Sequence, residues 1–158
     1  MSQELRLTIE LVPSPCWHSN LRKILPRSAW DKLRKQVYAQ YKNQCGICNA
    51  ENVTLDCHEI WQYDDEAHIQ KLTGFIALCK MCHLHKHPGF AAGLIAKGQL
   101  DADKFHEHFL RVNQCSDEEY AEHSAEVWRI WEERSAFDKQ WTTDFGNYAH
   151  LIPPKTED

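Results

Sequence analysis

Two C-x-x-C pairs constrain this chain more than any other feature of its sequence. Cys45 and Cys48 form the first pair, Cys79 and Cys82 form the second, and thirty residues separate the pairs. Each pair lets the chain turn so that both sulfurs face one ion, and four thiolates suit the tetrahedral coordination of Zn²⁺. The spacing therefore predicts a structural zinc site. A closed shell of four sulfurs leaves no open position on the ion, so we expect this zinc to hold the fold rather than to react.

The other cysteines and the composition favour this interpretation. The chain has seven cysteines, an odd number, and its first residues do not resemble a secretory signal. No apolar run approaches the ~20 residues that span a bilayer, so we expect a cytoplasmic protein with no membrane partner. Cys16, Cys57 and Cys115 have no partner at a matching spacing and are predicted to be small buried residues. A disulfide pair or unrelated buried thiols are the alternatives for the four paired cysteines.

Positive charge is concentrated near the N-terminus, although the net charge is −5. Residues 1–50 carry eight Lys or Arg and three Asp or Glu, whereas residues 51–158 carry ten and twenty. Within the basic part, residues 28–42 have helical periodicity, with Ser28 and Asp31 spaced as a capping box. An ordinary helix with a solvated rim is the alternative to a surface that binds phosphate. The candidates for nucleic-acid contacts are Arg34, Lys35 and Lys86.

Between the cysteine pairs the pattern predicts a hairpin followed by a helix. Residues 53–61 begin with β-branched and apolar alternation, which indicates a strand, and residues 75–79 indicate a second, buried strand. The polar residues 63–74 are predicted to form the loop between them. Residues 80–87 are expected to make one or two helical turns, which Pro88 stops.

The C-terminal part is predicted to be mostly helical. Residues 101–113 place apolar side chains on one side. Ser116 and Glu119 form a capping box before a second helix that runs to about residue 136. The aromatic tail, residues 141–154, is expected to form a short strand or a clasp over the core. The whole pattern predicts an α+β fold.

Three histidines form a second candidate site. If residues 80–87 are helical, His83 and His87 lie one turn apart on one face and can share an ion. The hairpin brings His58, at the end of the first strand, close to the start of this helix. Three imidazoles would hold one divalent ion with positions open for water and substrate. His85 points elsewhere, and the alternative is that these histidines are polar surface residues beside a zinc site.

The sequence around His58 does not fit a zinc protease. Such an enzyme carries H-E-x-x-H on a helix. Here the run is HEIWQ, with Gln62 in place of the second His, on a segment that is predicted to be a strand. We therefore exclude that class of enzyme.

These motifs resemble the HNH (ββα-metal) nuclease family, in its zinc-stapled bacterial branch. The resemblance rests on the first C-x-x-C pair, on LDCHEI at residues 55–60 and on LCKMCHLHK at residues 78–86. It implies a small ββα-metal core over residues 44–90, with a zinc site made by the four paired cysteines. An N-terminal amphipathic helix and a mostly helical C-terminal extension over residues 100–140 would flank this core within a single domain, residues 1–158.

The resemblance also implies one catalytic divalent ion, Mg²⁺, Mn²⁺, Ni²⁺ or Zn²⁺, beside a general base that activates water. By position, His58 and His83 match metal ligands, and His87 matches a second ligand on the helix. Glu59 falls at the position of the general base, where its ordinary pKa of ~4.3 makes it a weaker base than imidazole. A shifted alignment instead makes His58 the base and Cys57 the first ligand.

One further position departs from the family pattern. The family's Asn, expected five residues before Cys79, is Gly74 here. That Asn braces the loop that holds the base. Asp64, Asp65 or Glu66 is a candidate to replace it as brace or ligand, and a solvated acidic loop is the alternative.

Two functions are compatible with this pattern. The first is a metal-dependent endonuclease that hydrolyses phosphodiester bonds in nucleic acid, DNA before RNA, with Glu59, His58 and His83 as catalytic residues. The second is a catalytically weakened, zinc-stabilised module that binds nucleic acid or protein. Such a module needs only the four cysteines, so the number of bound ions distinguishes the two.

Overall fold

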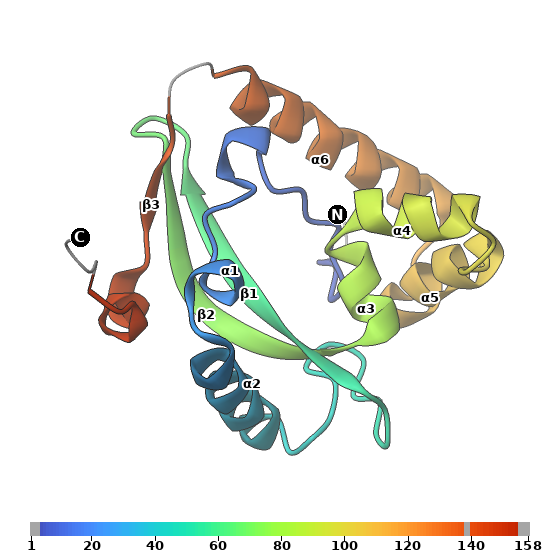
Figure 1. Ribbon diagram of the computed structural model, residues 1–158. Helices are drawn as coiled ribbons and strands as arrows, with labels where there is room; N and C mark the ends of the chain where they lie inside the picture. The colour runs from blue at the N-terminus through green and yellow to red at the C-terminus, as the bar shows by residue number, and fades with distance from the viewer. Residues whose placement is uncertain (1–3, 138–139, 155–158) are drawn as a thin grey trace.

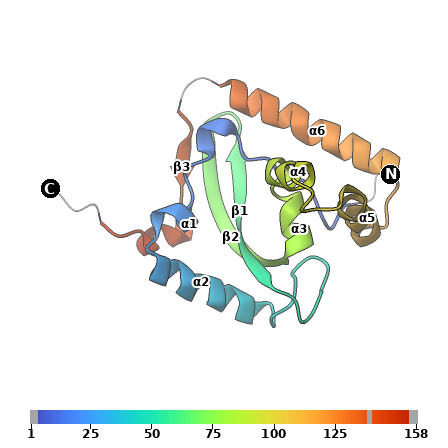
Figure 2. The same ribbon diagram turned by 45° about the vertical axis from the view of Figure 1, so that its right-hand side comes forward.

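The computed structural model describes residues 4–137 and 140–154 and has an α+β architecture, with helices around a three-stranded sheet (Figures 1 and 2). The strands are β1 Leu55–Asp64, β2 Ile69–Cys79 and β3 Thr142–Asp144. The helices are α1 Leu21–Ile24, α2 Arg27–Gln40, α3 Lys80–His85, α4 Pro88–Ala96, α5 Ala102–Asn113 and α6 Asp117–Ala136, with 3₁₀ turns η1 Ser14–Cys16 and η2 Gly146–Leu151. Over the described ranges, no helix combines the length and apolar character that a membrane span requires.

The strands β1 and β2 form one antiparallel hairpin, as predicted, but it is longer than expected. The prediction of a loop over residues 63–74 is wrong, because β1 continues to Asp64 and β2 begins at Ile69. The Asp64 carboxylate accepts the backbone N–H groups of Glu66 and Ala67 at 3.0 and 2.9 Å. This side-chain turn reverses the chain within a few residues, so no long loop is needed.

The hairpin separates two hydrophobic cores. On one face, Cys57 and Ala77 pack with α2. On the other face, Leu78 packs with Phe109 of α5 and with the four paired cysteines. Figures 1 and 2 show α2 and α3 on opposite sides of the hairpin. Neighbouring residues of a strand point to opposite faces. The side chains directly before and after Cys57 therefore point away from α2, toward the other face of the hairpin.

The C-terminal tail clasps the sheet, as predicted. β3 pairs parallel to β2, with Thr142 opposite Ile69. The η2 turn that follows places the Tyr148 ring 4.9 Å from that of Phe75. The tail therefore completes the core that β2 shares with α2.

Two predicted helix boundaries differ from the structure. The helix α2 begins at Arg27, one residue before Ser28, and no side chain caps it. Asp31 does not form a capping box, because it binds Arg34 at 2.8 Å instead. Pro88 lies in the first turn of a new helix, α4, where its missing N–H leaves no hydrogen bond unmade.

The helix α6 extends along one side of the molecule and buries none of its residues (Figure 1). Ser116 caps it as predicted, accepting the Glu119 N–H at 3.2 Å. Near its other end, Arg134 binds both oxygens of Asp65, in the hairpin turn, at 2.7 and 3.1 Å. Between these points His123 and Trp131 bond the backbone of Ile9 and Val12, so the helix is held against residues 9–12 and not directly against the sheet.

Residues 5–12, which we call the N-terminal segment, are fixed by buried polar side chains. Asn113 accepts the N–H of Leu7 at 2.8 Å and donates to its carbonyl at 2.9 Å. His123 Nε2 accepts the N–H of Ile9 at 2.9 Å. Because these bonds come from α5 and α6, the C-terminal helices set the position of the N-terminal segment.

Candidate metal centres and the adjoining cavity

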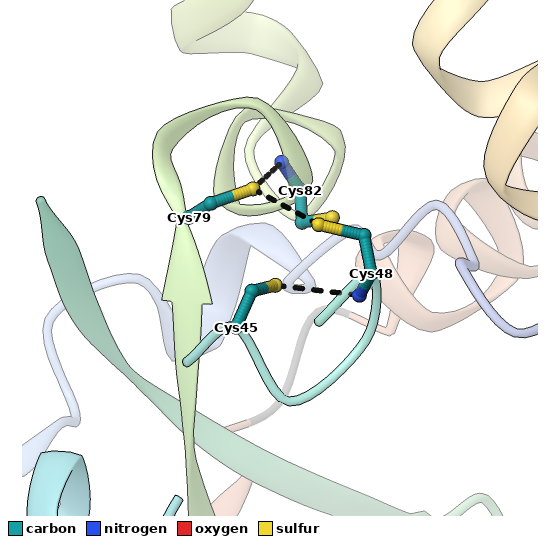
Figure 3. Close-up of side chains that lie close together, drawn as sticks. All are labelled: Cys45, Cys48, Cys79 and Cys82. Atoms are coloured by element: carbon teal, nitrogen blue, oxygen red, sulfur yellow. Dashed lines mark hydrogen bonds between the residues drawn. The ribbon is translucent and has the colours of Figure 1, made fainter. Parts of the chain in front are cut away.

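Four cysteines lie together where β2 meets α3, as their spacing predicts (Figure 3). Cys45 and Cys48 follow α2, Cys79 ends β2 and Cys82 lies in the first turn of α3. Their sulfurs all lie within 4.8 Å of one another, and the Cys48 and Cys79 sulfurs are 3.6 Å apart. A tetrahedral zinc ion with Zn–S bonds of ~2.3 Å needs sulfurs about 3.8 Å apart. The four-cysteine cluster therefore suits a metal such as zinc.

Gly46 allows the first cysteine pair to approach β2. Its N–H donates to the Ala77 carbonyl at 2.7 Å. A Cβ at this position would lie 2.7 Å from the Ile76 side chain and 2.8 Å from that of Tyr41. A larger residue would therefore push the first pair away from β2 and open the cluster.

Without an ion, the four-cysteine cluster favours one thiolate and disfavours the others. Hydrogen bonds from Cys79 and Cys82 hold the pKa of the Cys45 thiol well below its usual range, and the contact with Cys45 raises the pKa of Cys79 to about 12. One thiolate thus disfavours deprotonation of the next cysteine, and a divalent cation would remove that electrostatic cost. On α5, His108 has Nε2 3.2 Å from the Cys82 sulfur and Nδ1 3.2 Å from the Arg111 guanidinium. The ring can accept from Arg111 and donate to the sulfur.

A second group, the histidine cluster, joins His58 of β1 to His83 of α3 and to His87 just beyond it. One ring nitrogen of each lies within 4.8 Å of the others, and the Nε2 atoms of His83 and His87 are 3.1 Å apart. The ring centroid of His58 is 5.4 Å from that of His83 and 5.6 Å from that of His87. The structure therefore brings together the three histidines that the sequence singles out, at a spacing that can hold one divalent ion.

Two carboxylates orient the histidine cluster. Asp56 Oδ2 lies 3.0 Å from His83 Nδ1, and Glu10 Oε2 lies 2.7 Å from His58 Nε2. Histidines that bind metals usually bond a carboxylate through one ring nitrogen, which sets the tautomer and leaves the other nitrogen for the ion. The residues present thus fit a bound cation. Sequence reasoning missed both carboxylates, because Glu10 is far from the motif and Asp56 has the appearance of an ordinary strand residue.

Charge at the histidine cluster is also suited to a cation. His87 keeps an exposed surface, but desolvation by the protein around it lowers its pKa to about 4, and the nearby charges of His83, His58 and Arg22 add to this effect. His87 is therefore neutral near pH 7 and can offer a lone pair. Burial alone would raise the pKa of Glu10, but its hydrogen bond with His58 and the charge of Lys86 bring it down to about 2.

The pleat of β1 turns Glu59 to the other face of the strand from His58. Its two carboxylate oxygens accept the backbone N–H groups of Leu21 at 3.1 Å and Arg22 at 3.2 Å, in the first turn of α1. Burial raises the pKa of Glu59, and the two backbone bonds oppose that rise. Cys57 points to the same face and lies in the α2 core, where burial raises its pKa to about 12. The structure therefore offers no Cys57 ligand to the histidine cluster.

The three predicted nucleic-acid contacts lie in different environments. Lys86 is only 5% exposed, and its ammonium binds the Thr8 carbonyl at 2.8 Å and Glu10 at 3.2 Å. Its ammonium thus fastens the N-terminal segment, but Lys86 also lines the cavity described below, so its contact with nucleic acid stays a prediction. Arg34 and Lys35 are carried by α2, on the side of the hairpin away from α3.

Other candidates lie outside both clusters. His85 belongs to neither, as predicted, because it stacks on Phe105 with ring centroids 3.8 Å apart and burial lowers its pKa to about 4. The acidic residues of the hairpin turn are also engaged elsewhere, since Asp64 forms the turn and Asp65 binds Arg134. Neither belongs to the histidine cluster.

The histidine cluster opens into a cavity of about 1230 Å³. The N-terminal segment, α1, β1, the start of α4 and the inner face of α6 surround it. Arg22 and Lys23 of α1 lie on its wall and are exposed, and Arg22 forms no ion pair with any residue in the described ranges. Sequence reasoning did not single out either of them. The aromatic residues that line the cavity are Trp17, Trp61, Tyr63, Phe90, Trp128 and Trp131.

Comparisons with known proteins yielded no relative of this chain. No protein-family model, curated protein or solved structure matches it.

Proposed function

We propose that this protein is a metal-dependent endonuclease of the ββα-metal (HNH) type that hydrolyses phosphodiester bonds of nucleic acid. We favour DNA over RNA as its substrate. The histidine cluster is the observation that carries the proposal, because its three imidazoles converge at the wall of a large cavity. The succession of β1, β2 and α3, with the four-cysteine cluster at the junction of β2 and α3, supports the same family.

The residues around the histidine cluster have distinct roles in this proposal. A divalent ion bound there supplies a Lewis acid for a phosphoryl oxygen and lowers the pKa of water. His58, His83 and His87 offer the nitrogens that hold it. Asp56 and Glu10 fix the tautomers of the rings that they contact. Arg22 supplies a cation on the cavity wall for the phosphate oxygens.

In this proposal Glu59 braces α1, and we do not assign it the role of general base. Both of its oxygens already accept backbone N–H bonds. Glu59 lines the same cavity as His58, but its carboxylate is turned toward the start of α1. A carboxylate engaged in this way is better suited to fixing α1, and with it Arg22, than to taking a proton from water.

The four-cysteine cluster has a structural role in the proposal, as a site for Zn²⁺. Four sulfur ligands would close the coordination shell and leave no position for substrate. The site joins the first cysteine pair to the end of β2 and the start of α3. It would thereby hold α3, which carries His83, against the hairpin, which carries His58.

A plasmid-nicking assay tests the proposed activity. With Mg²⁺, Mn²⁺ or Ni²⁺, the wild-type protein is expected to nick plasmid DNA, and His83→Ala is expected to abolish nicking while leaving folding and zinc content intact. The matched control is His106→Ala, which removes a histidine of α5 that pairs with Asp117 outside the cluster. Nicking by His83→Ala in a nuclease-free preparation would contradict the proposal. A wild-type protein with one zinc and no nicking would favour the zinc-stabilised binding module.

A further inference from the structure

Exposed aromatic side chains line the cavity into which the histidine cluster opens. Among the large hydrophobic residues that the structure leaves exposed, Trp17, Phe90 and Trp128 are the aromatic ones, with 53%, 63% and 42% of their surface exposed. All three line the cavity into which the histidine cluster opens. Single exposed aromatic residues need no explanation, but three around one candidate site indicate a ligand with flat apolar faces.

The indole rings of the cavity are held in place by the protein itself. Trp17 Nε1 and Trp131 Nε1 both donate to the carbonyl of Val12, at 2.7 and 3.0 Å. Trp128 stands edge-on to Trp131, with ring centroids 5.5 Å apart and planes at 77°. Rings that are already ordered lose little conformational freedom when a ligand stacks on them.

The position of α6 keeps this aromatic surface available. The helix buries none of its residues, and its attachment through Arg134 to the hairpin turn lies near its C-terminal end. Figure 1 shows it running from beside α5 to the hairpin turn. Its inner face, which carries Trp128 and Trp131, therefore faces the cavity from the side opposite β1.

Cationic side chains accompany the aromatic rings. Arg22 and Lys23 of α1 line the same cavity. Lys23 Nζ donates to the backbone carbonyl of Trp17 at 3.4 Å, which ties this cation to the residue that carries one of the exposed rings. Proteins that bind single strands combine aromatic rings, on which successive bases stack, with cations that follow the phosphates.

We propose that the cavity binds a single-stranded nucleic acid, whose unpaired bases stack on Trp17, Phe90 and Trp128 and whose backbone passes Arg22 to reach the histidine cluster. The inference rests on the proposed nuclease function and narrows its substrate. A duplex buries the faces of its bases within its own stack, so it cannot offer them to these rings without opening. The cavity volume, about 1230 Å³, exceeds the ~300–1,000 Å³ of small-molecule sites, which suits a polymer strand.

Fluorescence anisotropy with labelled oligonucleotides tests the inference. The zinc-loaded full chain is used without added divalent ion, so that the probes are not cut. We expect single-stranded DNA or RNA to bind more tightly than a duplex of the same sequence. Stacking contributes ~1–3 kcal/mol per base, so Trp128→Ala should weaken single-strand binding by roughly 5- to 150-fold, whereas Trp128→Phe should retain most of it. The matched control is Ile24→Ala, because Ile24 is an exposed apolar residue of α1 that does not line the cavity.

Specific results would overturn the inference. Equal affinity for duplex and single strand would do so, as would single-strand binding that neither Trp128→Ala nor Trp17→Ala weakens, or no oligonucleotide binding at all. The two proposals fail separately. Plasmid nicking without a preference for single strands would contradict this inference but would agree with the proposed nuclease function. Single-strand binding that depends on Trp128, with no cleavage when any divalent ion is added, would contradict the nuclease function but would agree with the proposed binding surface.

Discussion

At the scale of single residues, the direction of three imidazole rings is the property on which the proposed chemistry depends. His83 and His58 each bond a carboxylate through one ring nitrogen, so their tautomers are set before any ion binds. His87 bonds no carboxylate among the described residues, and desolvation keeps it neutral instead, although it is exposed. The cluster is therefore pre-organised by two different means.

Removing the carboxylate beside His83 should loosen the site without removing a ligand. Asp56→Asn is expected to weaken the affinity for the exchangeable divalent ion by roughly 10- to 100-fold, as observed for residues that orient metal ligands. Isothermal titration calorimetry with Mn²⁺ or Ni²⁺ measures this change. Asp103→Asn, at an exposed position on α5, serves as the control. An unchanged affinity in Asp56→Asn would show that Asp56 does not orient a ligand.

The two roles considered for Glu59 predict different stability and activity for its variants. As a brace, it loses two charge-assisted bonds in Glu59→Ala, which should lower the free energy of unfolding by roughly 1.5–3 kcal/mol. Glu59→Gln keeps an oxygen acceptor and should lose less stability and retain nicking. Urea titration and the plasmid assay measure the two properties. If Glu59→Gln were fully stable and inactive, the general-base role would return to Glu59.

Spacing in the sequence was enough to find the metal-binding candidates but not their partners. Both clusters come from local motifs, in which C-x-x-C and the i, i+4 pair of His83 and His87 restrict geometry directly. Glu10 and His108 reach these clusters from distant segments, through contacts that no periodicity encodes. The contact of Lys86 with the N-terminal segment was missed for the same reason.

At the scale of elements, a buried polar residue explains the error in the hairpin. Gln70 is fully buried, yet it has partners in the Tyr63 hydroxyl at 3.0 Å and the Ser19 carbonyl at 3.2 Å. In the sequence alone, such a residue makes a strand look like a polar loop. The cap of α6 was predictable because it depends on two residues three positions apart, whereas β3 exists through its pairing with the distant strand β2.

The N-terminal segment should respond to acid through His123. Its Nε2 must be unprotonated to accept the Ile9 N–H, and burial lowers the pKa of His123 below its ordinary value of ~6.5. Because the folded pKa is lower, this contribution is fully present above the ordinary value of ~6.5 and is lost as the pH falls from there through the lowered folded pKa. The free energy of unfolding should therefore decline as the pH falls below ~6.5. Urea titrations should show a smaller decline in His123→Gln, which keeps an acceptor; parallel curves would contradict this assignment.

At the scale of the whole molecule, α3 links the two clusters. Its first turn supplies Cys82 to the four-cysteine cluster, and the next residue, His83, belongs to the histidine cluster. One short helix thus connects a site proposed to hold the fold with a site proposed to cut nucleic acid.

Loss of the structural zinc should unfold the protein, because structural zinc sites contribute directly to folding free energy. Cys45→Ser is expected to abolish the cooperative thermal transition, and Cys115→Ser, which alters a cysteine outside the cluster, should preserve it. Circular dichroism during heating measures both. A Cys45→Ser variant with an unchanged transition would refute the structural role of the four-cysteine cluster.

A metal count per chain, combined with a cleavage assay, tests the central claim most directly. After mild chelation, the wild-type protein should retain one tightly held zinc and lose nicking, and it should regain both a second ion and nicking when Mn²⁺ or Ni²⁺ is added. His83→Ala should keep the single zinc, take up no second ion and stay inactive. A wild-type chain that never binds more than one ion, or nicking that survives the loss of the second ion, would contradict the account.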